Sequence, residues 1–508
     1  MCGICASFGP AEPAEHARML SRLVHRGPDD EGMVHATGDA WLGHRRLSIV
    51  DLAGGAQPLA NEQGDLWLVG NGEIYNHDEV RDGLDVQFAT GSDNEAALAI
   101  IDTLGPRALG TLNGMFAFVA AGEDGRFVAA RDPVGIKPLY WANHEGRFRF
   151  ASEMGAFDPD WQRRVEVFPP GCYWTPEEGL VRFASAVPEA VVGVFDEPAT
   201  ADEPVPDDVL RRVREVLVQA VESQMMGDVP VGVFLSGGLD SSIVAAIAQR
   251  YLQRRGLTLK TFAVGLADSS DLDAARRVAH HLGTEHNEHV YTAEEAAEVL
   301  PDVVRTIEAF DPSLVRSAVP NYLLSRFTAQ HVKVVLTGEG ADELFAGYDY
   351  LREFEDADDL HEELVRSVEG LHNLNLQRCD RVTMAFGLEA RVPFLDREVI
   401  SLGLSIPAAW KIPRPGVPEK LALRKAFDGW LPADILWRDK EEFGDGSGAA
   451  SVLTPHFDDE ISGEHFAERR EEAPIGLRSK EELAYFEIFQ EHLPGVRPEQ
   501  TLGRFATA

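Results

Sequence analysis

The second half of the chain contains a short apolar run that changes abruptly into a helical pattern. Residues 231–235 are apolar and include two valines, which is typical of a buried strand. Ser236, Gly237 and Gly238 interrupt the run, and apolar residues recur at helical spacing from Ser241 onward. The pattern predicts a strand, a glycine turn and a helix, a geometry that points backbone N–H groups at an anion.

Strand-like and helix-like patterns alternate further along. Strands are predicted at residues 259–266, 288–291 and 332–336. Residues 272–282 predict a helix. The alternation predicts a doubly wound parallel sheet with helices, whose ligands bind at the carboxyl ends of the strands. Residues 374–396 predict a helix followed by a strand or turn, with polar residues placed unusually among apolar ones.

The first half carries many short strand patterns and few helical ones. Residues 45–51 predict a strand that begins with two arginines, and a helix is expected around residues 97–101. On local grounds the dipeptide Asn71-Gly72 marks a tight turn. Two stacked sheets flanked by helices are expected, with further strands at residues 66–69, 115–121, 127–131 and 148–153.

Residues 188–208 separate the two halves. This stretch is acidic, contains prolines and lacks apolar periodicity, so we expect a linker. A chain of 508 residues is also expected to form two or more domains. The expected domains are therefore residues 1–187 and residues 209–508.

The chain is strongly acidic, with a formal net charge of −37. Nucleic acid is disfavoured as a partner, because phosphate binding needs basic patches. No apolar stretch reaches about 18 residues and the first residues do not resemble a signal peptide, so no membrane partner is expected. Four cysteines are too few for a disulfide scaffold, which fits a reducing cytoplasm. The dispersed acidity suggests a cytoplasm of high salt, where self-repulsion is screened, and an ordinary acidic protein is the alternative.

The glycine turn has a specific sequence, S-G-G-x-D-S, beginning at Ser236. It differs from a P-loop because no lysine follows the glycines. It resembles the loop with which ATP pyrophosphatases grip the pyrophosphate of ATP, so ATP is the expected co-substrate. Gly237 and Gly238 let the backbone close around the ligand, and the hydroxyls of Ser241 and Ser242 add donors.

Two carboxylates follow the predicted strand at residues 332–336. Glu339 and Asp342 would repel a pyrophosphate unless a cation lay between them, and Mg²⁺ bound by carboxylate and phosphate oxygens solves this. Asp240 in the glycine turn is the natural second ligand, so Asp240 and Asp342 are the expected metal ligands. An N-capped helix beginning at Ala341 is the structural alternative, and both can hold.

Cys2 becomes the first residue when the initiator methionine is removed. A free α-amine beside a thiol is a nucleophile with its own base, because the amine titrates near neutral pH. Six motifs, MCGI, RGPD, HRRLSIVD, NGEIYN, TGSD and RDPVGIKPLY, resemble in order the glutaminase domain of class II amidotransferases, which use an N-terminal nucleophile. The resemblance runs from Met1 to about Gly171 and implies an Ntn-type α-β-β-α sandwich.

This resemblance implies a role for each matched residue. Cys2 would attack the side-chain amide of glutamine, and the side chain of Asn71 and the N–H of Gly72 would donate to the oxyanion. Arg46 would pair with the α-carboxylate of glutamine, and two carboxylates would hold its α-amine. The expected glutamine-binding set is Arg46, Leu47, Ser48, Ile49, Val50, Asn71 and Gly72, together with the two carboxylates, Glu73 and Asp93.

Four motifs of the second half, SGGLDSS, TGEGADE, LNLQRCDRVTMAFGLEARVPFLD and ILWRDKEEF, resemble glutamine-hydrolysing asparagine synthetases, from about residue 207 to 448. By that resemblance Glu339 acts in forming or consuming an acyl-adenylate and Lys440 binds pyrophosphate. The glycine run at residues 444–448 would be a lid. The residues expected to touch ATP are Leu235, Ser236, Gly237, Gly238, Asp240, Ser241, Ser242, Val264, Thr337 and Gly338.

The implied reaction is amidation of aspartate to asparagine through β-aspartyl-AMP, with ammonia passing from glutamine inside the protein. Amidation of a different carboxylate is the nearest alternative, because acceptor choice rests on few side chains. Closure of a β-lactam is disfavoured since the surroundings of Cys2 are intact, and the complete set of matched residues argues against a catalytically idle paralogue. Aspartate, glutamine and ATP as substrates, and a homodimer, are expected from the family alone.

Overall fold

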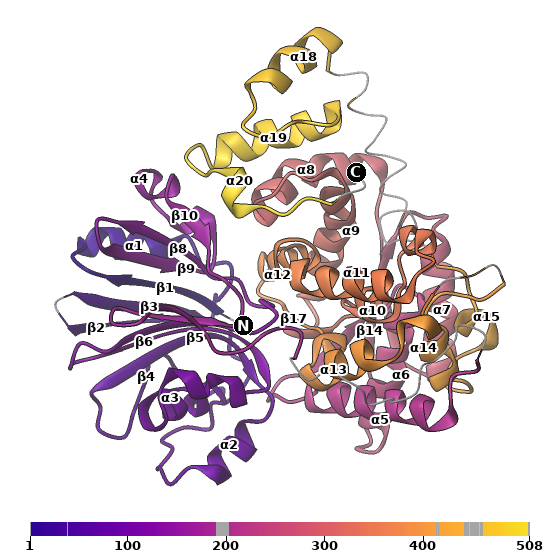
Figure 1. Ribbon diagram of the computed structural model, residues 1–508, viewed down its shortest axis with the longest axis horizontal. Coiled ribbons are helices and arrows are strands. Elements are labelled where there is room, and N and C mark those ends of the chain that lie inside the picture. The colour runs from indigo at the N-terminus through magenta and orange to yellow at the C-terminus, as the bar shows by residue number, and fades with distance from the viewer. Residues whose placement is uncertain are drawn as a thin grey trace.

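The computed structural model describes residues 2–37, 39–188, 203–412, 414, 416–440, 447, 457 and 461–505. Two bodies lie side by side in the molecule (Figure 1). The first contains two antiparallel sheets, and the second contains a parallel sheet surrounded by helices. Most of the predicted linker at residues 188–208 and of the predicted lid at residues 444–448 lies outside the described residues.

Twelve strands in two antiparallel sheets form the N-terminal half. They are β1 (Cys2–Phe8), β2 (Asp30–Thr37), β3 (Ala40–Arg46), β4 (Leu59–Ala60), β5 (Leu66–Ile74), β6 (Gly114–Gly122), β7 (Phe127–Arg131), β8 (Tyr140–His144), β9 (Arg147–Ala151), β10 (Val165–Val167), β11 (Cys172–Thr175) and β12 (Gly179–Arg182). The first sheet has the order β10-β8-β9-β1-β3-β2, and the second has the order β12-β11-β7-β6-β5-β4.

The two sheets enclose an apolar core and carry helices on their outer faces. Ile4, Leu42, Val119 and Phe150 are among the buried side chains between the sheets. α1 packs on the first sheet and α3 on the second. The predicted α-β-β-α sandwich is confirmed, with helices α1 (Pro13–Ser21), α2 (His77–Gly83), α3 (Asn94–Thr103) and α4 (Pro159–Gln162).

The predicted turn at Asn71-Gly72 is wrong, because β5 runs through both residues. Gly72 pairs with Phe116 of β6 at a φ of 152°. A Cβ at this position would lie 1.9 Å from the carbonyl oxygen of Met115. Glycine is therefore required here by a close approach of two strands and by its backbone angle, and not by a hairpin.

A five-stranded sheet forms the centre of the C-terminal half, with the order β15-β14-β13-β16-β17 and every pair parallel. Its strands are β13 (Val231–Phe234), β14 (Lys260–Gly265), β15 (Glu285–Val290), β16 (Val334–Leu336) and β17 (Glu389–Arg391). Val233 packs among side chains of the helices on one face, and its neighbour Phe234 packs on the opposite face. Burial on both faces explains the continuous apolar run of β13 and confirms the predicted doubly wound sheet.

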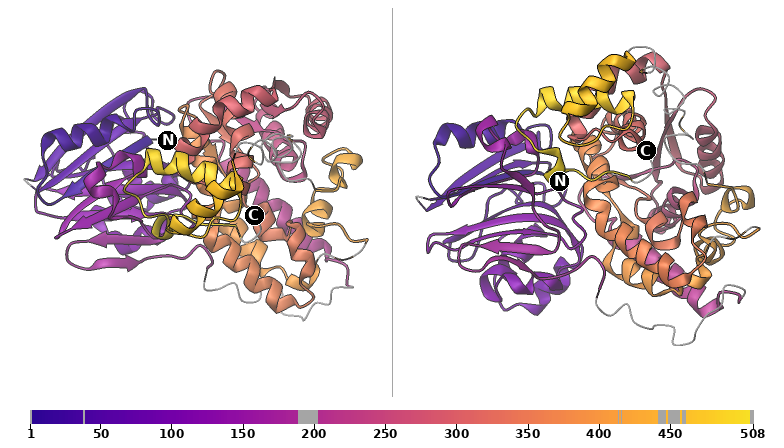
Figure 2. Two further views of the ribbon diagram at one scale, coloured as in Figure 1. Left: turned by 90° about the horizontal axis from the view of Figure 1, so that it is seen from above. Right: turned by 45° about the horizontal axis from the view of Figure 1, so that its top comes forward.

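Helices cover both faces of this sheet, and further helices pack outside that layer. The α-helices of the C-terminal half are α5 (Asp207–Ser223), α6 (Leu239–Gln253), α7 (Ser270–Leu282), α8 (Ala293–Ile307), α9 (Pro312–Thr328), α10 (Ala341–Phe345), α11 (Ala357–Gly370), α12 (Asn375–Met384), α13 (Arg397–Ser405), α14 (Leu421–Ala426), α15 (Ala433–Leu436), α18 (Gly463–Glu472), α19 (Lys480–His492) and α20 (Pro498–Thr501). α19 packs on α8 and α9, while α20 reaches β10 of the N-terminal half (Figure 2). Within the described ranges, no helix is long and apolar enough to cross a membrane.

Candidate active sites

Cys2 begins the first strand and lies opposite Arg46 in the register of β1 and β3. Cys2 is 7% exposed, and its backbone N–H donates to Oδ1 of Asn71 at 3.0 Å. Burial raises the pKa of the Cys2 thiol, so the thiol is protonated at neutral pH. Attack by this sulfur therefore needs a base, and an α-amine freed by removal of Met1 would be the nearest one.

Asn71 presents an unused hydrogen-bond donor beside Cys2. Its Nδ2 is buried and has no partner among the described residues, while its Oδ1 is fixed by the N–H of Cys2. A buried donor without a partner lowers the stability of the folded protein by about 1–3 kcal/mol. The Nδ2 group is therefore well placed to donate to a bound ligand. Asn94 donates to the carbonyl oxygen of Gly72 at 3.1 Å and holds the next residue of the strand.

Arg46 ends β3 (Ala40–Arg46), so the strand predicted at residues 45–51 is misplaced: it shares only its first two residues with the observed strand. The guanidinium of Arg46 donates to the carbonyl oxygen of Asp51 at 2.7 Å and, over longer distances, to those of Val50 and Leu52. These bonds bend residues 47–52 into a loop. The backbone of Leu47 in this loop contacts the thiol of Cys2, and Arg46 lies opposite Cys2 in the paired strands. These two of the predicted glutamine-binding residues therefore lie beside Cys2.

Glu73 and Asp93 are two buried carboxylates in the same region, 4% and 2% exposed. Asp93 Oδ2 accepts from the N–H of Ile74 at 2.6 Å, and Oε2 of Glu73 has no hydrogen-bond partner among the residues described. Burial, and then the charges of Glu389 and Asp93, raise the pKa of Glu73 well above its ordinary value. A bound ammonium group would relieve this repulsion, which suits the predicted contact with an α-amine.

The turn between β13 and α6 is fixed by its own hydroxyl groups. Ser236 Oγ accepts from the N–H of Gly238 at 3.2 Å and lies 3.1 Å from Oγ of Ser241. Gly237 has a φ of 76°, and a Cβ there would lie 2.5 Å from Cβ of Ala274. The first turn of α6 follows directly, so free backbone N–H groups face the turn, as anion binding requires.

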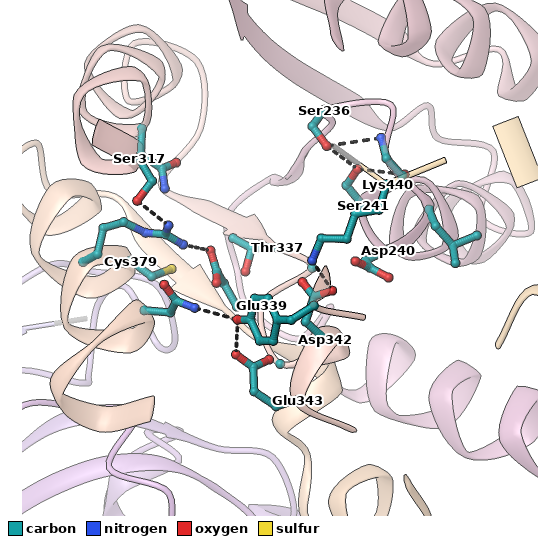
Figure 3. A pocket seen from close by; sticks show the side chains of 18 of the residues that line it. Ser236, Asp240, Ser241, Ser317, Thr337, Glu339, Asp342, Glu343, Cys379 and Lys440 are labelled. Carbon is teal, nitrogen blue, oxygen red and sulfur yellow. Dashed lines mark hydrogen bonds and ion pairs between the residues drawn. The ribbon is translucent and has the colours of Figure 1, made fainter. Parts of the chain in front are cut away.

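A cavity of about 490 Å³ opens at the carboxyl ends of β13, β14 and β16 (Figure 3). The predicted residues that line it are Leu235, Ser236, Gly238, Asp240, Ser241, Val264, Thr337, Gly338, Glu339, Asp342 and Lys440. Gly237 and Ser242 belong to the same turn but do not line the cavity, and Ser242 is fully buried. None of the predicted glutamine-binding residues borders it, so the predicted glutamine site lies outside this cavity.

Lys420 occupies the centre of the charge cluster in the cavity, and no sequence motif marks this residue. Its Nζ lies 2.5 Å from Oδ2 of Asp240 and 2.7 Å from Oδ1 of Asp342. Lys440 also pairs with Asp342. Burial alone would raise the pKa of Asp342, but the two ammonium groups lower it below its ordinary value. Asp342 is thus held in its charged form inside the protein, whereas burial raises the pKa of Asp240 above its ordinary value.

Arg378 connects Glu339 to α9. Its guanidinium pairs with the carboxylate of Glu339, and its Nη1 donates to Oγ of Ser317 at 2.8 Å (Figure 3). The side chain of Arg378 is 8% exposed, and that of Glu339 is 20% exposed. Glu339 therefore faces the cavity as an oriented carboxylate.

α12 separates the cavity from the N-terminal half. Arg378 and Cys379 line the cavity. The next two residues, Asp380 and Arg381, form hydrogen bonds to the N-terminal half, where Nη1 of Arg381 donates to the carbonyl oxygen of Ser152 at 2.7 Å. α12 thus contacts the cavity on one side and the N-terminal half on the other. Its polar residues make these contacts, which explains why they occur among apolar ones.

Comparison with protein families divides the chain in the same way. The Glutamine amidotransferase domain model matches residues 1–172, and the Asparagine synthase model matches residues 212–355 and 352–498. The chain is 38% identical over 541 residues to a probable asparagine synthetase (glutamine-hydrolyzing) of Dictyostelium discoideum, covering 99% of this chain and 96% of that protein. It is 41% identical over 517 residues to asparagine synthetase B (glutamine-hydrolyzing) of Escherichia coli K12, covering 97% and 92%.

The chain belongs to the family of glutamine-hydrolysing asparagine synthetases.

Asparagine synthetases of this family are carbon–nitrogen ligases. The two family models match two consecutive parts of this chain, one that contains Cys2 and one that contains the cavity. Among solved structures, a glutamine phosphoribosylpyrophosphate amidotransferase from B. subtilis shares 18% identity at a TM-score of 0.32, covering 57% of this chain and 81% of that one. That similarity is too low to carry an inference about this synthetase.

Proposed function

We propose that the protein converts aspartate to asparagine, using ATP for activation and glutamine as the nitrogen donor. Glutamate, AMP and pyrophosphate are the other products. Activation is needed because a carboxylate is a poor electrophile without a leaving group. Each site then carries out one half of the reaction.

At the first site, Cys2 attacks the side-chain amide of glutamine and forms a thioester. The α-amine of Cys2 takes the thiol proton and returns it to the departing ammonia. Nδ2 of Asn71 and the N–H of Gly72 would stabilise the oxyanion, and one such donor is typically worth about 3 kcal/mol. Arg46 would pair with the α-carboxylate, and Glu73 and Asp93 would hold the α-amine. Water then releases glutamate.

At the second site, a β-carboxylate oxygen of aspartate attacks the α-phosphorus of ATP and pyrophosphate leaves. The turn at Ser236 and the ammonium of Lys440 would hold the pyrophosphate, while Leu235 and Val264 would contact the nucleoside. Ammonia then attacks the acyl carbon of β-aspartyl-AMP and AMP departs. Glu339, which lines the cavity, would accept the proton that the ammonia loses.

Magnesium suits the carboxylates of this site. Oδ1 of Asp240 is buried and lacks a hydrogen-bond partner in the described part of the chain. Oxygen ligands of this kind are those that Mg²⁺ prefers. Asp240 and Asp342 would hold the ion, which would offset the negative charge of the phosphates when bound. The ammonium group of Lys420 would also offset part of the negative charge of the phosphates.

Ammonia is proposed to pass between the sites inside the protein. In neutral water it would be protonated and lose its nucleophilic lone pair. The position of α12 supports this route, because Cys379 lines the cavity and Asp380 accepts from Nη2 of Arg26 at 3.2 Å. Nε of the same Arg26 donates to the carbonyl oxygen of Cys2 at 3.1 Å, so a single helix separates the two sites.

The proposal rests on the occurrence of two features in one chain. Nδ2 of Asn71 is a buried, unused donor beside Cys2. A cavity with lysines paired to carboxylates lies at the carboxyl ends of the parallel strands. Aspartate labelled with ¹⁸O in its β-carboxylate tests it directly. One labelled oxygen should appear in AMP, because the acyl–oxygen bond breaks when ammonia displaces AMP. Label in orthophosphate would indicate an acyl phosphate instead. Pyrophosphate release with another carboxylate but not with aspartate would favour a different acceptor.

A further inference from the structure

The residues that follow α20 form part of the cavity wall. Arg504 and Phe505 line the cavity together with Ser313, Arg316 and Ser317 of α9. The Asparagine synthase family model ends at residue 498, so Arg504 and Phe505 lie beyond the matched segment. Their contribution to the cavity is therefore a feature of this chain that the family match does not cover.

Two buried carboxylates fix this segment in place. Glu482, which is fully buried, pairs with Arg504, and Asp311, which is 3% exposed, accepts from the N–H of Phe505 at 3.2 Å. Arg478 joins the two anchors: its Nη2 donates to Asp311 at 2.7 Å and its Nη1 donates to the carbonyl oxygen of Phe505 at 2.8 Å. A buried carboxylate without a partner would destabilise the folded protein. These ion pairs and hydrogen bonds therefore hold residues 504–505 in this position.

The segment is attached to the side of the cavity that holds Glu339. Asp311 caps α9 by accepting from the N–H of Leu314 at 3.2 Å. Ser317, less than two turns further along α9, accepts from Arg378, which pairs with Glu339. Figure 3 shows Ser317 and the pyrophosphate turn on opposite sides of the pocket. Ser317 of α9 thus lies across the pocket from the turn that would hold the phosphates, and Phe505 is attached through Asp311 to the start of the same helix.

We propose that Phe505 and Arg504 close the acceptor end of the cavity and limit the length of the amino acid that is activated there. The inference rests on the proposed function, because it takes the acceptor to lie between Glu339 and α9. Phe505 forms an apolar part of the cavity wall. Arg504 forms the adjoining part, and its ion pair with Glu482 holds it in place and offsets its charge. The selected ligand is the shorter of the two α-amino dicarboxylates, aspartate over glutamate. A boundary that excludes one methylene group discriminates by about 10–200-fold.

The variant Phe505→Ala tests this role, with ammonium chloride as the nitrogen source so that the glutamine site is bypassed. The KM for aspartate should rise about tenfold with kcat changed less than about twofold, because an uncharged boundary and not a reacting group is lost. The ratio of kcat/KM for aspartate over glutamate in pyrophosphate release should fall about tenfold. The KM for ATP and the rate of glutamine hydrolysis should not change. Phe505→Leu, which restores most of the volume, should restore the ratio.

Two arginine variants provide a matched comparison. Arg504→Gln should lower the aspartate-to-glutamate ratio in the same direction as Phe505→Ala, whereas Arg470→Gln, an equal change of charge on the exposed side of α18, should behave as wild type. A folded Phe505→Ala protein with wild-type selectivity would overturn the inference, and so would equal rises in KM for aspartate and ATP. If the wild-type protein releases no pyrophosphate with aspartate, the proposed function fails first and the inference falls with it.

Discussion

Arg26 and Asp380 form an ion pair across the boundary between the two halves, with Nη1 of Arg26 2.9 Å from Oδ2 of Asp380. Their side chains are 0% and 3% exposed. Nη1 of Arg26 also lies 2.7 Å from Glu153, and its Nε donates to the carbonyl oxygen of Cys2. One guanidinium therefore contacts both the backbone of the proposed nucleophile and the helix that borders the second cavity.

Replacement of Asp380 by alanine should weaken both the fold and the coupling of the sites. Removing one partner of a buried pair costs about 3 kcal/mol, because the remaining charge stays buried. Denaturant unfolding should show a loss of this size, and glutamine-dependent synthesis should fall more than ammonia-dependent synthesis. Asp434→Ala removes the partner of Arg277 from a pair whose side chains are 53% and 56% exposed, and it should change little. Equal behaviour of the two variants would contradict this role of Asp380.

Lys420 should be essential to the second site alone. In Lys420→Met, Asp240 loses its ion-pair partner at 2.5 Å and Asp342 keeps only Lys440. Aspartate-dependent pyrophosphate release should fall about a hundredfold, a typical loss when a preorganised charge is removed from a reacting site. Glutamine hydrolysis should remain near the wild-type rate. Lys425→Met, five residues along the same segment and outside the cavity lining, is the matched control. Wild-type pyrophosphate release by Lys420→Met would refute the assignment.

Lys411 should make stability depend on pH. Burial lowers the pKa of Lys411 from 10.5 to about 7, and its Nζ donates to the carbonyl oxygens of Gly403 at 2.7 Å and Leu344 at 3.3 Å. Between these two pKa values the unfolded chain keeps a proton that the folded chain has released. The free energy of unfolding should therefore rise with pH from about 7 to about 10.5, by up to about 5 kcal/mol.

The variant Lys411→Met isolates this contribution from those of other groups. His361 is a titratable neighbour of Lys411, and its own pKa is lowered, chiefly by burial and then by Lys411. The variant should be more stable than wild type at pH 7, and the difference should shrink as the pH approaches 10.5. A difference that stays constant over this range would show that Lys411 is protonated throughout.

Local pattern predicted much of the fold. The strands at residues 231–235, 115–121 and 127–131 were predicted nearly residue for residue, because buried strands are continuous apolar runs bounded by turn residues. The turn at Asn71-Gly72 was predicted wrongly, since the sequence alone does not reveal that a neighbouring strand comes within 1.9 Å of a Cβ at Gly72. The strand predicted at residues 45–51 is misplaced, because β3 ends at Arg46, whose guanidinium donates to the carbonyl groups of the loop that follows.

Long-range contacts explain the residues that sequence reasoning missed. Lys420 lies 180 positions from Asp240, and no motif marks it. Arg504 and Phe505 reach the cavity through Asp311 and Glu482, in a part of the chain that lacks a distinctive pattern. The domain boundaries, a high-salt cytoplasm and a homodimer remain predictions.

Cys2→Ala should abolish synthesis from glutamine and leave synthesis from ammonium chloride close to wild type. The lining of the cavity includes neither Cys2 nor the predicted glutamine-binding residues, so the proposed activation of aspartate should continue there. Cys5→Ala is the matched control, because Cys5 is fully buried on the same strand and has no proposed chemical role. Glutamine use by a folded Cys2→Ala protein would remove Cys2 from the mechanism. An equal loss of glutamine use in Cys5→Ala would point to damage to the strand.

Isotope competition tests most directly whether the two sites work as one enzyme with an internal route. Glutamine labelled with ¹⁵N in its amide is supplied with aspartate, ATP and a large excess of unlabelled ammonium chloride, and the asparagine is analysed by mass spectrometry. Internal transfer predicts that the amide of asparagine carries ¹⁵N far above its fraction in the free ammonia pool. An amide whose ¹⁵N content equals that of the pool would show that ammonia escapes to solvent before it reacts, and would contradict the account.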